Sequence, residues 1–82
     1  MILKTKGVSV DIQAGANLVG DATIVSVINT NTTAALIVNS NGNNLWIAAG
    51  ERVLIKKEYD ETLQATTGAT AEVWATPVAY LA

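Results

Sequence analysis

Short apolar runs separated by glycine, asparagine and threonine follow one another along this sequence. Residues 8–13 alternate between apolar and polar side chains, which is the period of a half-buried strand. Residues 23–28 are rich in β-branched side chains and end in a polar turn. The other apolar runs lie at residues 1–5, 34–38, 45–48, 52–57, 63–66, 71–76 and 78–81. Short runs at this spacing predict an all-β fold, a small antiparallel β-sandwich or barrel of about seven strands, and no segment has a convincing helical period.

The clearest single element is a hairpin formed by residues 34–38 and 45–48. Its loop contains Asn41-Gly42, the pair that most readily takes the two positive φ values of a type I′ turn. With these two residues as the loop, Ile37 lies opposite Trp46. Both faces of the hairpin are then apolar, so one face needs a core and the other needs a cover.

A second polar turn, at Thr30-Asn31, predicts that residues 23–28 pair with this hairpin in a three-strand meander. This pairing places Ile24 opposite Ile37 and extends the apolar face that carries Trp46. The sequence therefore predicts a candidate interface made of Ile24, Ile37 and Trp46.

The ends of the chain add three further interface candidates. Ile2 and Leu3 anchor an extended N-terminal arm, residues 1–6, which either adds a strand to the sheet edge of a neighbour or frays. Trp74 is flanked by polar residues on its own side of the strand, which favours partial exposure at the rim of an interface. Pro77 cannot donate to a strand ladder and marks a sheet edge or a bulge.

The composition predicts a single domain, residues 1–82, that depends on association. A chain of 82 residues is marginal as an independent domain. It has no cysteine for disulfides, and no histidine or cysteine for a structural zinc. Half of the residues are apolar and 15% are charged, which favours contacts with copies of itself or with another protein.

Charge and hydropathy exclude several classes of partner. The net charge is −2 and the five basic residues are scattered, which argues against nucleic acid. No apolar run reaches the roughly 18 residues of a membrane span, and the first residues lack the features of a signal peptide, so we expect no membrane contact and synthesis in the cytoplasm.

Catalysis and cofactor binding are not expected. Seven carboxylates are present, but without histidine or cysteine the usual bases, nucleophiles and metal ligands are missing. The cluster Glu58, Asp60 and Glu61 offers oxygen ligands for calcium, but it lacks the spacing of a calcium loop and reads more simply as a solvated corner. Residues 31–33, Asn-Thr-Thr, match the glycosylation pattern, and without a signal peptide a chance match is favoured.

The two tryptophans leave three interpretations open. Trp46 and Trp74 are either interface residues, core residues in a chain without phenylalanine, or stacking platforms for sugars or bases. The platform interpretation predicts a carbohydrate-binding or adhesin-like module. A toxin inhibitor or a small enzyme subunit is also compatible with the size, although no specific residue points to either.

Three C-terminal segments resemble small structural proteins of tailed bacteriophage virions, notably those of phages that infect cyanobacteria. They are residues 47–57 (IAAGERVLIKK), 60–65 (DETLQA) and 75–80 (ATPVAY). The resemblance covers roughly the C-terminal half and implies a head decoration (cement) protein or a neck or tail accessory protein, located in the virion. The expected partners are the capsid, neck or tail protein and copies of the chain itself.

Overall fold

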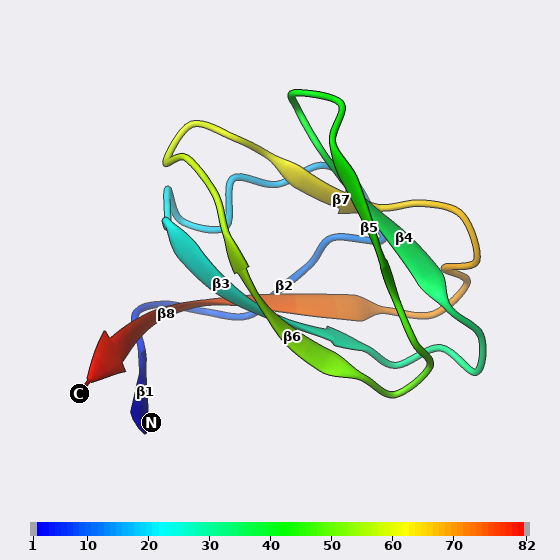
Figure 1. Ribbon diagram of the computed structural model, residues 1–82, viewed down its shortest axis with the longest axis horizontal. Helices are drawn as coiled ribbons and strands as arrows, with labels where there is room; N and C mark the ends of the chain where they lie inside the picture. Colours follow the sequence, from blue (N-terminus) through cyan, green and yellow to red (C-terminus); the bar gives the residue numbers. More distant parts are fainter. Residues whose placement is uncertain (1, 82) are drawn as a thin grey trace.

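The computed structural model describes residues 2–81, with side-chain positions for residues 3–79. Within these residues it contains eight β-strands and no helix (Figure 1). The strands are β1 (Ile2–Thr5), β2 (Val10–Asp11), β3 (Ile24–Asn29), β4 (Ala35–Asn39), β5 (Asn44–Ile47), β6 (Arg52–Lys56), β7 (Leu63–Ala65) and β8 (Val73–Leu81). The predicted all-β class is confirmed.

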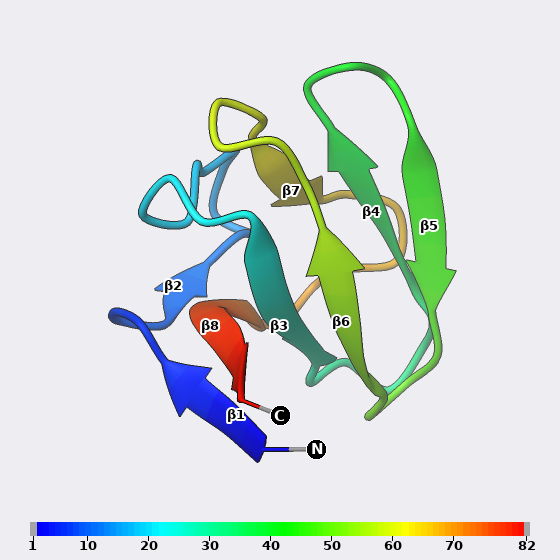
Figure 2. The ribbon, with the colours of Figure 1, turned by 60° about the vertical axis from the view of Figure 1, so that its left-hand side comes forward.

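The strands form two antiparallel sheets that pack as a small sandwich (Figure 2). The larger sheet has the order β1-β8-β3-β6, and β2 also pairs with β8. The smaller sheet has the order β5-β4-β7. Ile12 joins the sheets along one side, because its N–H donates to Val73 O at 3.0 Å and its carbonyl accepts from Ala65 N at 3.0 Å.

The core lies between the two sheets and consists of the inward side chains of both. Alternate positions along β3 and β8 supply one half of it, and alternate positions along β4 and β7 supply much of the other. The buried cluster is Ile12, Val19, Val25, Val27, Ile37, Ile47, Leu63, Ala65, Val73 and Ala75. These side chains are short and mostly β-branched, which suits a thin sandwich without a large aromatic residue inside.

The loop of the β4–β5 hairpin has three residues instead of the predicted two. Gly42 N donates to Asn39 O at 3.0 Å, and Gly42 has a φ of +85°. This is a type I turn followed by one residue in the left-handed region, the usual three-residue hairpin loop. The side chain of Asn39 supports the loop by accepting hydrogen bonds from the N–H groups of Asn41 and Asn43, each at 3.0 Å.

The longer loop shifts the predicted register by one residue. Leu36 lies opposite Trp46, and Ile37 lies opposite Leu45. A shift of one residue exchanges the two faces of a strand. The predicted pairing of Ile37 with Trp46 is therefore wrong: Ile37 is buried in the core, 2% exposed, and Trp46 is 55% exposed on the other face.

The predicted three-strand meander is also wrong, because β3 and β4 belong to different sheets. β3 pairs with β6 and β8, and the chain crosses to the smaller sheet after Asn29. The buried side chain of Asn29 holds this crossing, since its Nδ2 contacts Thr33 O, Ile47 O and Ala48 O at 3.0, 3.1 and 3.2 Å. The side chain of Asn29 thus supplies the hydrogen-bond donor for these three carbonyl groups, although β3 and β4 do not pair as a hairpin.

The strand predicted for residues 8–13 is reduced to β2, because a bulge interrupts its pairing with β8. Lys6 N donates to Pro77 O at 2.8 Å, and pairing resumes two residues out of register with Val10 opposite Ala75. Pro77 has no N–H to offer on this side, which accounts for the break. Val8, predicted to point inward, lies in the bulge and is 83% exposed.

The N-terminal arm is ordered as a two-stranded ribbon within its own chain. β1 pairs with the last part of β8, from Ile2 opposite Leu81 to Thr5 opposite Val78. Figure 2 shows this ribbon at the end of the molecule away from the β4–β5 loop. The predicted arm thus has a partner strand in the same molecule.

Candidate interaction surfaces

The outer face of the larger sheet carries one apolar surface, which we call the Trp74 face. Its members stand on the side of β3, β6 and β8 that points away from the core, and they are Ile24, Ile28, Leu54 and Trp74. Trp74 is 39% exposed and lies directly opposite Ile28. The three aliphatic side chains are each half-buried.

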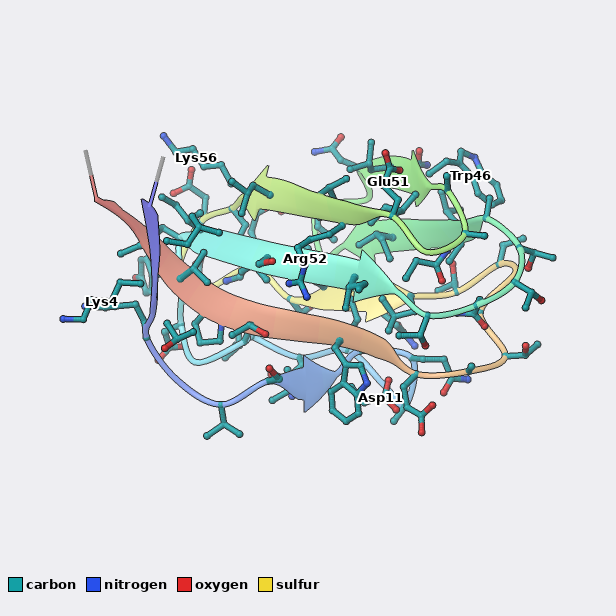
Figure 3. All side chains as sticks on the ribbon, turned by 90° about the horizontal axis from the view of Figure 1, so that it is seen from below. Lys4, Asp11, Trp46, Glu51, Arg52 and Lys56 are labelled. Atoms are coloured by element: carbon teal, nitrogen blue, oxygen red, sulfur yellow. The ribbon has the colours of Figure 1, made fainter. Side chains whose placement is uncertain are left out.

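One polar pair lies in the middle of the Trp74 face. Arg52 extends from β6 across β3 (Figure 3), and its Nη1 donates to Ser26 Oγ at 2.6 Å. Ser26 is 2% exposed, so Arg52 shields the only hydroxyl on the outer side of β3. The apolar side chains are therefore interrupted by positive charge, from Arg52 in the middle of the face and from Lys56, which lies opposite Ile24.

The outer face of the smaller sheet carries a second apolar surface, the Trp46 face. It consists of Leu36, Val38 and Trp46. Trp46 lies opposite Leu36 and is 55% exposed, and Val38 lies between Asn44 and Gln64 on the neighbouring strands. Figure 3 shows Trp46 on the opposite side of the molecule from Asp11, which neighbours Trp74 on the larger sheet.

The structure separates the predicted interface residues into several groups. Ile24 and Trp74 share one face, and Trp46 lies on the other. Ile37 is a core residue, so it does not belong to a surface. Leu3 lies on β1 and is 38% exposed. The backbone of Ile2 pairs with Leu81, and its side chain lies outside the described side chains.

Sequence reasoning missed the part of the Trp74 face that comes from β6. Val53, Leu54 and Ile55 are three successive apolar residues, and such a run places apolar side chains on both faces of a strand. Leu54 points outward, whereas Val53 and Ile55 pack against the core. This run of three apolar residues is the signal in the sequence for a second apolar face.

The acidic corner formed by Glu58, Asp60 and Glu61 is held by internal hydrogen bonds and is not simply exposed to solvent. Glu61 is 8% exposed, and its carboxylate accepts hydrogen bonds from Glu58 N at 2.7 Å and from Asn41 Nδ2 at 2.5 Å. Among residues 2–81, no group of three acidic side chains is placed to hold a metal ion. The corner instead fixes the connection between β6 and β7 to the tip of the β4–β5 hairpin.

Lys57 is buried beneath this corner. It is 4% exposed, and its Nζ donates to Glu58 O at 3.0 Å. Burial lowers the pKa of Lys57 from its ordinary value of 10.5, while the carboxylates of Glu61, Asp21 and Asp60 act in the opposite direction. Because burial has the larger effect, the charged form of Lys57 is less favourable in the folded chain than in water.

The glycosylation pattern at residues 31–33 is not available in the folded chain. Asn31 is 6% exposed, and its Oδ1 accepts hydrogen bonds from Thr70 N and Ala71 N at 2.8 and 2.7 Å. Its Nδ2, the atom that would carry a glycan, donates to Asn29 Oδ1 and Ala71 O. Asn31 therefore has a structural role.

A groove of about 330 Å³ lies beside the β1–β8 ribbon. It is lined by Lys6, residues 20–24 and residues 77–79. Next to it, Val19 and Asp21 have positive φ values of +55° and +58°, a conformation that is unfavourable for non-glycine residues. Strained backbone is typical of ligand sites. In this turn the Val19 side chain is buried in the core, and Ala22 N donates to Val19 O at 3.2 Å.

Comparisons with family models, with curated proteins and with solved structures give no match to this chain. Within residues 2–81, no helix has the length and apolar character needed to cross a membrane. The geometry of the two faces is therefore the basis for a functional proposal.

Proposed function

We propose that this protein is a non-enzymatic structural component of a virion, most simply a capsid decoration (cement) protein. In this role it is made in the host cytoplasm and held on the particle by contacts with the capsid protein and with copies of itself. The observation that carries the proposal is the presence of a tryptophan-bearing apolar surface on each outer face of so small a sandwich. The resemblance of the C-terminal half to phage structural proteins supports the same role.

The mechanism is burial of apolar surface without chemistry. The Trp74 face offers a sheet surface on which Ile28 lies beside the tryptophan and Ile24 and Leu54 lie further along the same side. Contact with a shell protein removes these side chains from water. A typical specific interface buries about 800 Å² on each partner. Many copies on one particle add avidity, so each contact can be individually weak.

The experiment is to look for the protein in particles and then to vary the Trp74 face. Particles are purified by density gradient from lysates of cells that make this chain, and the protein is measured by mass spectrometry. Purified Trp74→Ser is then compared with the natural chain for binding to particles depleted of the protein. We expect Trp74→Ser to bind at least tenfold more weakly.

Val8→Ser is the matched control, because Val8 is exposed but lies in the bulge between β1 and β2. It should bind as the natural chain does. Absence of the protein from purified particles, or equal binding of Trp74→Ser and the natural chain, would contradict the proposal.

A carbohydrate-binding module is the second candidate, and the Trp46 face favours it. The exposed indole of Trp46 shares its side of β5 with the amide of Asn44, and Gln64 lies on the same face of the sheet, across β4. Such a face combines a stacking surface with hydrogen-bond donors and acceptors, as sugar-binding sites do. A glycan array separates the two candidates. The virion proposal predicts no glycan that depends on Trp46, whereas a hit lost in Trp46→Ala favours the module.

A further inference from the structure

Strand β5 presents a free edge whose hydrogen-bonding groups can be assigned. Leu36 N donates to Thr67 O at 3.0 Å and Leu36 O accepts from Thr66 N at 2.8 Å, so the peptide groups of Leu36 point toward β7. Leu36 and Trp46 are consequently a non-hydrogen-bonded pair, and the N–H and C=O of Trp46 point away from β4. By alternation, those of Asn44 point the same way.

This edge carries no electrostatic protection. Residues 22–50 contain no aspartate, glutamate, lysine or arginine, so the whole β4–β5 hairpin is uncharged. Leu45 is 46% exposed and Trp46 is 55% exposed. An uncharged, apolar and exposed edge strand is the arrangement that most readily pairs with another strand.

The other edges of the two sheets are covered or charged. The far edge of β7 is bonded to Asn17 in both directions, at 3.0 and 2.9 Å. β6 carries Arg52 and Lys56, which repel a second copy of the same strand. β1 carries Lys4, and the bulge next to it breaks the edge. Among residues 2–81, β5 is thus the edge suited to pairing.

We propose that two copies of this chain associate through β5, paired antiparallel about a two-fold axis at Leu45. In this register Asn44 lies opposite Trp46 of the second copy and the reverse, so both free residues of each edge exchange N–H···O bonds. Leu45 meets Leu45 of the second copy in the central non-hydrogen-bonded pair, where side chains approach most closely. A shift in either direction leaves one of the two free residues without this exchange.

A second copy is favoured as the occupant because the edge is complementary to itself. Two-fold pairing needs the same surface on both partners, and an uncharged edge brings no like charges together. Beside Leu45, a groove of about 90 Å³ is lined by Ile37, Ile55 and asparagines 39, 43 and 44. Leu45 of the second copy covers this groove at the open side of the sandwich.

Pairing joins the two three-stranded sheets into one continuous sheet and places both Trp46 faces side by side. The inference makes specific the self-association that forms part of the proposed function. Its test uses free protein without particles, so the dimer and the virion role can fail separately.

The first experiment measures mass against concentration by sedimentation velocity. The natural chain should shift from 8.5 kDa toward twice that mass as its concentration rises. Leu45→Lys and Leu45→Glu each place like charges across the two-fold axis and should raise the dissociation constant at least tenfold. An equimolar mixture of the two variants should recover association, because opposite charges then face each other.

Val8→Lys and Val8→Glu are the controls, since they add the same charges at an exposed apolar residue away from β5. They should associate as the natural chain does. A natural chain that stays at 8.5 kDa at all concentrations would overturn the proposal. So would a mixture of Leu45→Lys and Leu45→Glu that associates no more tightly than either variant alone.

The second experiment uses the absence of cysteine from the chain. In a non-hydrogen-bonded antiparallel pair the Cα atoms are about 4.5 Å apart, which lies within the range of a disulfide. Leu45→Cys should therefore oxidise to a covalent dimer at least tenfold faster than Val8→Cys. Equal rates would overturn the assigned register. Circular dichroism of each variant checks that the sheets are intact.

Discussion

The side-chain amide of Asn31 donates a hydrogen bond to Oδ1 of Asn29 at 2.9 Å, and both side chains are buried. Asn29 lies at the end of β3 in the larger sheet, and its Nδ2 reaches carbonyl groups of the smaller sheet. Asn31 continues the contact to the segment before β8 through Ala71. Two neighbouring asparagines thus connect three parts of the sandwich at one end.

Replacing Asn29 with alanine should reduce the free energy of unfolding by about 3 kcal/mol, because buried carbonyl groups lose their donor. Chemical denaturation followed by tryptophan fluorescence measures the change. Asn43→Ala, at an exposed loop position, is the control and should change stability by less than about 0.5 kcal/mol. Equal effects of the two substitutions would contradict a structural role for Asn29.

Gly68→Ala should be strongly destabilising. Gly68 has a φ of +83°, and a Cβ there would overlap the carbonyl oxygen of Ala34. Strain and displacement together should cost about 3 kcal/mol of unfolding free energy. Gly15→Ala, where a Cβ meets no atom within 4 Å, should stay within about 1 kcal/mol of the natural chain in the same denaturation experiment.

The corrected hairpin register predicts a large loss of stability at Ile37 and a small one at Trp46. Ile37→Ala should lower the unfolding free energy by about 3 kcal/mol, since it empties part of the core. Trp46→Ala removes an exposed side chain and a contact with Leu36, and should cost about 1 kcal/mol or less. Thermal unfolding by circular dichroism measures both, and a larger loss for Trp46→Ala would restore the original register.

Lys57 should make stability rise at alkaline pH. Its pKa in the folded protein is below the ordinary 10.5, so the charged form is less favourable in the folded than in the unfolded chain. This penalty is present at neutral pH and is relieved as the pH rises through the lowered pKa toward 10.5. Lys57→Met should lack the rise.

The measurement is the free energy of unfolding by urea at a series of pH values from neutrality to 10.5. Lys56→Met is the control, because Lys56 is exposed and has the same charge. It should keep the alkaline rise of the natural chain. A rise that persists in Lys57→Met would show that other groups produce it.

The strand content of this protein was predictable because each strand is a local pattern. Each of the eight strands lies within a predicted run or extends at most one residue beyond it, except that β8 joins the two runs 71–76 and 78–81 through Pro77. Pro77 was predicted to mark a sheet edge or a bulge, and a bulge lies opposite it. The hairpin of β4 and β5 was also predicted, since two apolar runs flank a loop rich in asparagine and glycine.

The register and the assignment of strands to sheets were not predictable from those local signals. A three-residue loop needs one positive φ, at Gly42, where the predicted loop needed two, and the Asn39 side chain decides between them. Likewise, a polar turn at residues 30–34 suits both a hairpin and a crossing between sheets. The choice depends on Asn29, whose acceptors Ile47 and Ala48 are distant in sequence.

The predicted placement of the candidate interface residues on one face depended on the register. Trp46 and Trp74 are exposed, but Ile37 changed sides with the shift of one residue. The charge-free stretch from residue 22 to residue 50 was a usable signal for an unprotected edge, since it is visible without a structure.

The pairing of Ile2 with Leu81 has a practical consequence for engineering. The beginning and the end of the described chain emerge together, at the end of the molecule away from the β4–β5 loop (Figure 2). A short linker between them, with new termini opened in the 40–42 loop, would give a circular permutant that retains the ladders of both sheets. Cargo peptides fused to the β1–β8 ribbon would leave the molecule at the end away from the β4–β5 loop.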